Sequence, residues 1–82
     1  MNEGGGYMQT VNYGQVRLKI EEQMKAQGIS INKLAFRAEM QRTQLKAYMR
    51  NEVQRVDLSI LARLCYALEC DLDDIIEYSK PE

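Results

Sequence analysis

The side chains best suited to bind a partner lie between residues 41 and 50. Amide, guanidinium, hydroxyl and ammonium groups occur there at helical spacing, in Gln41, Arg42, Thr43, Lys46 and Arg50. Because residues four apart lie on one face of a helix, the three cationic side chains of this set form a single ridge. Such groups read base edges and bind phosphate oxygens. The pattern favours a nucleic acid as partner. The alternative is a basic helix face that serves only solubility.

Two short helical patterns with almost no linker between them hold these residues. The spacing of apolar residues predicts helices over residues 31–38 and 41–50, with only Glu39 and Met40 between them. A link this short predicts a steep crossing of the two helices, as in a helix-turn-helix. One face of the second helix then stays open to an external partner. The inner faces are expected to bury Leu34, Ala35, Leu45 and Tyr48.

Residues that satisfy helix-end backbone groups mark where the helices begin and end. Ser30 can accept a hydrogen bond from a backbone N–H in the first turn of the first of these helices. Gly28 is expected to end the preceding helix and Asn51 the recognition helix, because both residue types tolerate the left-handed conformation. Asp57 and Asp71 are expected to cap two later helices.

Three further helices are predicted around this pair. The first covers residues 12–27, with Leu18 off an apolar face made by Tyr13, Val16, Ile20 and Met24. The next covers residues 58–68 and is expected to bury Leu58, Leu61, Leu64, Cys65 and Leu68. The last covers residues 72–78 and is expected to pack Leu72, Ile75 and Ile76 against the core. No alternation of useful strand length is expected, so the predicted fold class is all-α.

Length and composition fit one small domain. The chain has 82 residues, of which 45% are apolar, enough for a single small core. We expect the domain over residues 12–79, a flexible tail with a triple glycine over residues 1–11, and a C-terminal tail over residues 80–82. Because the sequence shows no apolar run of membrane-spanning length and no signal-peptide hydrophobic region, a cytoplasmic location is predicted.

The net charge of −1 hides a strong asymmetry. Residues 33–55 carry six basic and two acidic side chains, a local charge of +4. Residues 57–82 carry two basic and seven acidic side chains, a local charge of −5. A basic centre beside an acidic segment can orient a domain on a polyanion. The basic side chains of the centre are Lys33, Arg37, Arg42, Lys46, Arg50 and Arg55.

Catalysis and metal binding find little support in the residue types. With no histidine and two cysteines, a structural zinc site within one chain is close to excluded. No glycine-rich phosphate loop and no nucleophile–base pair is visible, so we expect no enzyme, no cofactor and no small-molecule substrate. Asp71, Asp73 and Asp74 suggest helix capping more than a metal site. Cys65 is expected in the core and Cys70 nearer the surface, both as free thiols.

Several runs of residues carry a resemblance to a known family. They are the GIS-x-x-x-LA run from Gly28 to Ala35, Met40 in the turn, Leu45 in the third helix, the leucine-rich run from Asp57 to Cys70, and the closing D-L-x-D-I-I-E-Y. In this order they resemble the Cro/repressor-type, or XRE-type, helix-turn-helix family, over about residues 13–78. The resemblance implies a compact five-helix, lambda-repressor-like domain. Its implied function is that of a sequence-specific DNA-binding transcriptional regulator, with the helix over residues 41–50 in the major groove.

The resemblance also implies which residues contact DNA. Gln41, Arg42 and Thr43 take the base-reading start of the recognition helix, and Lys46 and Ala47 follow one turn later. Of these, Arg42 is expected to bridge O6 and N7 of a guanine. Further contacts, mainly with phosphates, are expected from Arg50, Asn32, Lys33 and Arg55.

Three positions depart from the family pattern. Glu39 stands in the turn where a glycine is usual, so either a left-handed glutamate is mildly strained or the turn is built differently. Ile31 stands where many members place a phosphate-binding glutamine, and it cannot make that contact. Ala47 replaces the long polar side chain that some members use to read bases.

Double-stranded DNA is the expected partner, bound by a homodimer on a palindromic site. The residues considered for the dimer surface are Leu18, Tyr66, Ile76 and Tyr78. The alternative is a protein-interaction or antitoxin-like module that uses a repurposed helix-turn-helix. The acidic total charge, Glu39 and Ile31 favour that alternative.

Overall fold

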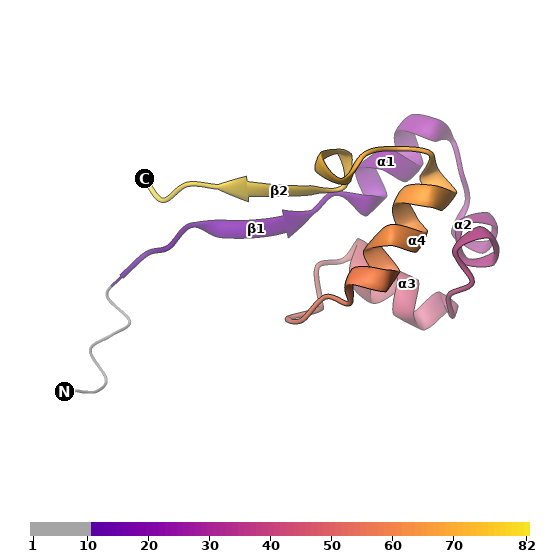
Figure 1. Ribbon diagram of the computed structural model, residues 1–82, viewed down its shortest axis with the longest axis horizontal. Coiled ribbons are helices and arrows are strands. Elements are labelled where there is room, and N and C mark those ends of the chain that lie inside the picture. The colour runs from indigo at the N-terminus through magenta and orange to yellow at the C-terminus, as the bar shows by residue number, and fades with distance from the viewer. Residues whose placement is uncertain (1–10) are drawn as a thin grey trace.

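The computed structural model describes residues 11–82, so nearly all of the tail predicted over residues 1–11 lies outside the described residues. In the described part, four α-helices form a body from which a two-stranded antiparallel ribbon extends (Figure 1). The elements follow in the order β1 (Gln15–Leu18), α1 (Ile20–Gln27), α2 (Ile31–Ala38), α3 (Arg42–Met49), α4 (Leu58–Leu68), the 3₁₀ turn η2 (Leu72–Asp74) and β2 (Ile76–Ser79). The bounds of α2, α3 and α4 match the predicted helices to within one residue.

Each of these four helices ends in the same way. A left-handed residue follows the helix, with φ between 52° and 67°, and these residues are Gly28, Glu39, Asn51 and Glu69. The next residue then donates its N–H back to a carbonyl of the last turn, as from Met40 to Ala35 at 2.9 Å and from Cys70 to Cys65 at 3.1 Å. This is the Schellman arrangement, which satisfies carbonyl groups that the helix leaves without partners. The left-handed ends predicted at Gly28 and Asn51 are confirmed.

The predicted N-caps are also confirmed. The Ser30 hydroxyl accepts the backbone N–H of the third residue of α2 at 3.1 Å. The Asp57 carboxylate accepts from the N–H of Ser59 at 2.8 Å and from its hydroxyl at 2.7 Å, and these bonds lower the pKa of Asp57. At η2, the Asp74 carboxylate accepts the N–H of Asp71 at 2.9 Å in a capping box.

The helix predicted over residues 12–27 is wrong in its first half, where the chain forms β1. β1 pairs antiparallel with β2, with Val16 opposite Tyr78 and Leu18 opposite Ile76. Val16 and Leu18 share a face of the ribbon because they are two residues apart. Only Leu18 joins the core, so it is 3% exposed whereas Val16 is 62% exposed. Tyr13 is exposed as well, so the expected burial of Val16 and Tyr13 is wrong. The prediction that Leu18 lies outside the apolar face is also wrong.

The last predicted helix, over residues 72–78, is wrong as well. Its first residues form the single turn η2, and the rest form β2, where β-branched and aromatic side chains favour an extended backbone paired with β1. Ile75 is fully buried and Ile76 half-buried as expected, but Leu72 is exposed. The five-helix, all-α description is not confirmed. The described residues form four α-helices, a 3₁₀ turn and a two-stranded sheet.

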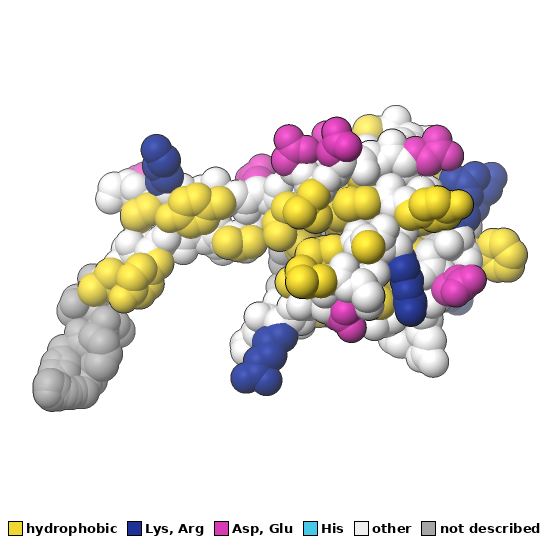
Figure 2. All heavy atoms as spheres, viewed as in Figure 1, with side chains coloured by type: hydrophobic (Ala, Val, Ile, Leu, Met, Phe, Trp, Pro, Cys, Tyr) yellow, Lys and Arg dark blue, Asp and Glu magenta, His cyan; other side chains and the backbone are white. Residues whose placement is uncertain are grey.

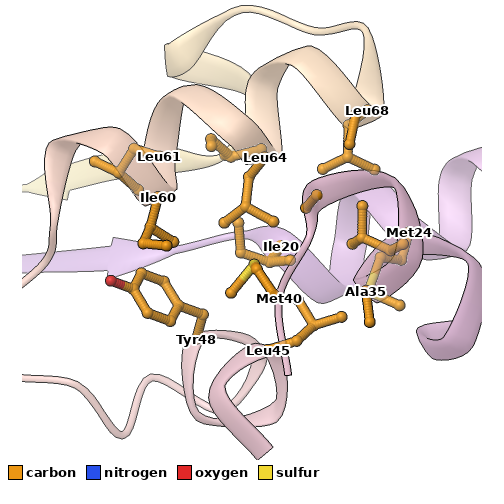
Figure 3. Close-up of a cluster of buried hydrophobic side chains, with 14 of the residues drawn as sticks. Ile20, Met24, Ala35, Met40, Leu45, Tyr48, Ile60, Leu61, Leu64 and Leu68 are labelled. Carbon is orange, nitrogen blue, oxygen red and sulfur yellow. The ribbon is translucent and has the colours of Figure 1, made fainter. Parts of the chain in front are cut away.

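One hydrophobic core joins the helices to the base of the ribbon (Figure 3). Its fully buried large side chains are Ile20, Leu34, Leu45, Leu64, Leu68 and Ile75. On α4 the buried stripe includes Ile60 and Ala67, which the predicted stripe lacked. Leu58 lies about 120° around that helix from Leu64. It is therefore 79% exposed, and its predicted burial is wrong.

The two cysteines meet at the end of α4. Both are free and half-buried, and they sit at the two positions that a Schellman motif brings together. Cys65 packs against the core only from its edge, because it lies about 100° around the helix from the centre of the buried stripe. Burial raises the pKa of both thiols, that of Cys70 to about 11.

Candidate nucleic-acid interface

The turn between α2 and α3 is built around a strained glutamate. Glu39 has φ 55° and ψ 50°, a left-handed conformation that favours glycine. The turn is held by Met40, which is buried, and by Arg63 of α4, whose Nη1 donates to the Glu39 carbonyl at 3.1 Å. Of the two possibilities considered for this turn, a left-handed, strained Glu39 is therefore the correct one. The steep crossing follows from this Schellman end of α2.

α3 is attached to the body on both its inner face and its C-terminal end. Leu45 is 0% and Tyr48 4% exposed, and the Tyr48 hydroxyl accepts the backbone N–H of Asp57 at 3.2 Å. Just beyond α3, the Asn51 side chain binds the backbone of Leu18 twice. Its Oδ1 accepts the Leu18 N–H at 2.7 Å, and its Nδ2 donates to the Leu18 carbonyl at 3.0 Å. These contacts fix α3 relative to α4 and to the ribbon.

The remaining face of α3 is open. Because Leu45 and Tyr48 face inward, the residues on the opposite side of the helix face away from the body. The predicted base-reading and phosphate-binding residues of this segment are exposed (Gln41, Arg42, Thr43 and Arg50) or half-exposed (Lys46 and Ala47). Gln41 is the N-cap and not the first helical residue, and its side chain makes no capping hydrogen bond. Its amide is therefore not committed to capping α3.

The cations on this face differ from those on the ribbon. Within residues 11–82, no carboxylate pairs with Arg42, Lys46 or Arg50, and the ion pairs present involve only cations of β1 and its junction with α1. Arg17 lies 2.6 Å from Glu22 and 3.6 Å from Glu77. The hydrogen bond between Arg17 and Glu22 raises the pKa of the former and lowers that of the latter. The α3 cations keep their electrostatic attraction for an external anion.

The start of α2 adds a second surface for an anion. Asn32 and Lys33 are exposed in its first turn, at the positive end of the helix dipole. Ile31 is half-buried and packs against the core, so it contributes no polar group there. Arg55 is exposed in the loop between α3 and α4. DNA contacts by these three polar residues stay predictions.

The structure adds one residue to the open face and shows where that face ends. Gln44, which the sequence interpretation omitted, is exposed in the first turn of α3. It lies about 100° around the helix from Thr43, beside the predicted readers. Its position in the first turn and its long amide side chain could have identified Gln44 as a base-reading candidate from the sequence. At the other end of α3, Arg50 lines a shallow hollow together with Arg17, Glu21, Glu22 and Lys25, so acidic and basic side chains mix there.

Features outside this interface have simpler structural explanations. One carboxylate oxygen each of Asp71, Asp73 and Asp74 lies within 4.8 Å of the others, and all three residues are exposed. Asp71 and Asp74 form the capping box of η2, as the sequence predicts. No helix in residues 11–82 has the length and apolar character needed to cross a membrane.

Comparison with known families agrees with the geometry of α2, the turn and α3. No curated protein gives a significant match to the sequence. The family model of the Cro/C1-type helix-turn-helix DNA-binding domain matches residues 19–81, and all four α-helices described above lie within this range. Because this match spans most of the chain, the protein belongs to the Cro/C1-type helix-turn-helix DNA-binding family.

Proposed function

We propose that this protein is a sequence-specific DNA-binding transcriptional regulator that inserts α3 into the major groove. The observation that carries the proposal is the open face of α3 within a Cro/C1-type domain. That face presents Arg42, Lys46 and Arg50 without carboxylate partners among the described residues. Their charges are available to phosphates and base edges, which make up the surface of a DNA groove.

The start of α3 is the part best placed to read bases. In helix-turn-helix proteins, the N-terminal residues of the second helix contact base edges. We expect Arg42 to donate to O6 and N7 of a guanine, and Gln41 or Gln44 to pair with an adenine. Lys46, Arg50, Lys33 and Arg55 are expected to contact phosphates. Ala47 supplies no polar group, so we expect few direct base contacts from the second turn.

A single α3 reads only one half-site. We therefore expect two copies of the chain to bind a palindromic site, with their α3 helices in successive major grooves. A single domain can still bind one half-site without a second copy.

Selection of bound sequences from a random pool of duplex DNA tests the proposal. We expect enrichment of a defined motif and an affinity that falls steeply with salt, because each phosphate contact releases counterions. Arg42→Ala should relax the preference at one base position by roughly 1–3 kcal/mol. Lys80→Ala is the matched control, because it also removes one exposed positive charge but lies outside the helix-turn-helix.

Two results would contradict the proposal: recovery of no motif from the pool, or an affinity that does not change with salt. An equal effect of the Arg42 and Lys80 substitutions on base preference would contradict the role given to Arg42.

Two exposed aromatic side chains support the protein-interaction alternative. Phe36 on α2 and Tyr66 on α4 are each 84% exposed. If the domain binds a protein through Phe36, Phe36→Asp should abolish capture of that protein and Arg42→Ala should not. Retention of every captured protein by the Phe36 variant would reject the alternative.

A further inference from the structure

The two cysteines of the chain lie at the end of α4, outside α2, the turn and α3. If α4 continued past Leu68, Cys65 and Cys70 would lie about 140° apart around the helix. The chain instead turns back at Glu69, and the Cys70 N–H donates to the Cys65 carbonyl at 3.1 Å. Standard backbone bond lengths then hold the two Cα atoms within roughly 7 Å, the largest separation that a disulfide spans without backbone movement.

The end of α4 is held in this conformation by several contacts. Gln27 of α1 donates its Nε2 to the Leu68 carbonyl at 2.7 Å. Glu69 has φ 52°, and its N–H donates to the Tyr66 carbonyl at 3.2 Å. Because a left-handed conformation is costly for a residue other than glycine, Glu69 keeps it only while its surroundings hold it there. The folded chain therefore presents its two cysteines in a fixed relative position.

Both thiols can be reached from solvent. They are free and half-buried, and they line one open hollow. The other residues that line it are Arg37 of α2 and Tyr66, Ala67, Glu69 and Asp71 at the end of α4. The two thiols contact each other, and each affects the pKa of the other. A small molecule that enters the hollow can therefore meet both sulfur atoms.

The surroundings of the hollow decide which sulfur reacts first and with what kind of molecule. Burial is the main cause that raises the pKa of both thiols, that of Cys70 to about 11. The contact between the thiols offsets part of this rise at Cys65 and adds to it at Cys70. Because the thiolate is the attacking species, Cys65 is the better first nucleophile. Acidic side chains gather along the edge of the body that holds η2 and the end of α4 (Figure 2), and they disfavour the approach of an anion.

We propose that Cys65 and Cys70 form a reversible modification site, which a small neutral or cationic organic disulfide converts to an intrachain disulfide. In the first step, the Cys65 thiolate attacks one sulfur of the small disulfide, forms a mixed disulfide and releases one small thiol. In the second step, the Cys70 thiolate attacks the Cys65 sulfur and releases the other half as a second small thiol. The chain loses two electrons and two protons, and the small disulfide gains both. An excess of the small thiol reverses the two steps.

The second step is favoured because the two sulfurs already lie side by side. Their reaction is intramolecular, so its effective concentration depends on how well the folded chain positions them. In an unfolded chain the same two cysteines meet only part of the time. The folded state therefore favours the disulfide, and by linkage the disulfide stabilises the folded state. It holds the strained end of α4 closed, and neither step involves α3 or DNA.

Oxidation of the folded chain with hydroxyethyl disulfide, a neutral probe, tests the proposal. Mass spectrometry should find a single chain that is lighter by two hydrogen atoms and carries no part of the probe. Cys70→Ser should stop at the mixed disulfide, because the second nucleophile is missing. Cys65→Ser is the matched control, and it should react with the probe more slowly than Cys70→Ser does.

Equilibration of the unaltered chain with hydroxyethyl disulfide and 2-mercaptoethanol measures the effective concentration of the two thiols. We expect a value at least roughly tenfold higher for the folded chain than for the chain in urea. The oxidised chain should also unfold at a thermal midpoint roughly 5 °C higher than the reduced chain.

Accumulation of a chain that carries the probe on both cysteines would overturn the proposal, and so would copies joined to each other by a disulfide. A folded chain that stays reduced under conditions that oxidise it in urea would overturn it as well. An effective concentration no higher in the folded chain than in urea would show that the end of α4 holds the two sulfurs apart. Faster reaction of Cys65→Ser than of Cys70→Ser would contradict the order of the two steps.

Discussion

The ribbon and the open face of α3 both carry arginine, but they place it in opposite surroundings. Arg17 on β1 has Glu22 and Glu77 within ion-pair distance. Arg42 and Arg50 on α3 have no such partner among the described residues. The apolar side chains show the reverse arrangement. α3 buries Leu45 and Tyr48, whereas the ribbon exposes large apolar side chains on one face.

This difference separates two kinds of surface on one small domain. A cation that already has carboxylate partners gains little from an external anion, because binding would weaken the pairs it has. A cation without such partners gains the full attraction of a phosphate. Exposed apolar surface instead favours contact with another apolar surface. The α3 face therefore keeps its charges for an external polyanion, whereas the ribbon uses its own, and Asn51 connects the two regions.

The largest expected effect disrupts the ribbon while leaving the helix-turn-helix in place. Gly14 has φ 88°, and a Cβ there would lie 2.3 Å from the Ser79 carbonyl oxygen. Gly14→Ala should therefore cost on the order of 2–3 kcal/mol and open the ribbon at that end. Amide hydrogen exchange should accelerate in β1 and β2 and stay unchanged in α2 and α3.

Gly28→Ala is the matched control for this prediction. Its φ is 67°, but no other atom lies within 4 Å of an added Cβ. This variant should show only the conformational cost of about 1 kcal/mol, located at the end of α1. Equal losses of stability in the two variants would mean that the ribbon is not packed as described.

The next effect breaks the link between the two surfaces. Asn51→Gly keeps a residue type that accepts φ 58° but removes both hydrogen bonds to Leu18. At about 1 kcal/mol for each bond, unfolding by urea should show a loss of about 2 kcal/mol. Exchange of the Leu18 amide should accelerate most. A variant as stable as the unaltered chain would show that Asn51 serves only as a left-handed helix end.

Local rules predicted the helix-turn-helix well. The ends of α2 follow from Ser30 and from a short turn, and its burial follows from helical spacing within one segment. The exposure of the predicted readers on α3 follows from the burial of Leu45 and Tyr48. Which bases or phosphates they contact could not be derived, because those contacts depend on a DNA sequence that the chain does not contain.

The ribbon was missed because its pairing joins the two ends of the domain. Val16 and Ile20 are four residues apart, which fits a helix, yet Val16, Leu18 and Ile20 also alternate with charged residues as in a strand. Ile76 and Tyr78 alternate in the same way. Neither run is long enough to decide by itself. Only their pairing, from Gln15 opposite Ser79 to Leu18 opposite Ile76, favours the strand.

A smaller effect of opposite sign is expected at the turn before α3. Glu39 has nearly the same φ as Asn51, 55° against 58°, but no side-chain hydrogen bond among residues 11–82 holds it there. Glu39→Gly should therefore stabilise the chain by about 1 kcal/mol, whereas glycine at Asn51 destabilises it. The bond from Arg63 to the carbonyl of residue 39 is kept, since it involves only the backbone. Denaturant unfolding of the two variants side by side measures both signs, and a stability loss at both positions would contradict the strain assigned to Glu39.

The smallest effect tests the contrast between the arginines directly. Arg50→Ala should lower the slope of log affinity for DNA against log salt by about one, because one phosphate contact is lost. Arg17→Ala removes the same charge, but its guanidinium already binds Glu22 and Glu77, so the slope should change little. Titrations of a labelled duplex from roughly 50 to 200 mM salt separate the two outcomes. An equal fall in slope for both variants would mean that DNA responds only to the total charge of the domain. In that case, the ion pairs of Arg17 with Glu22 and Glu77 would not reduce its contribution to DNA binding.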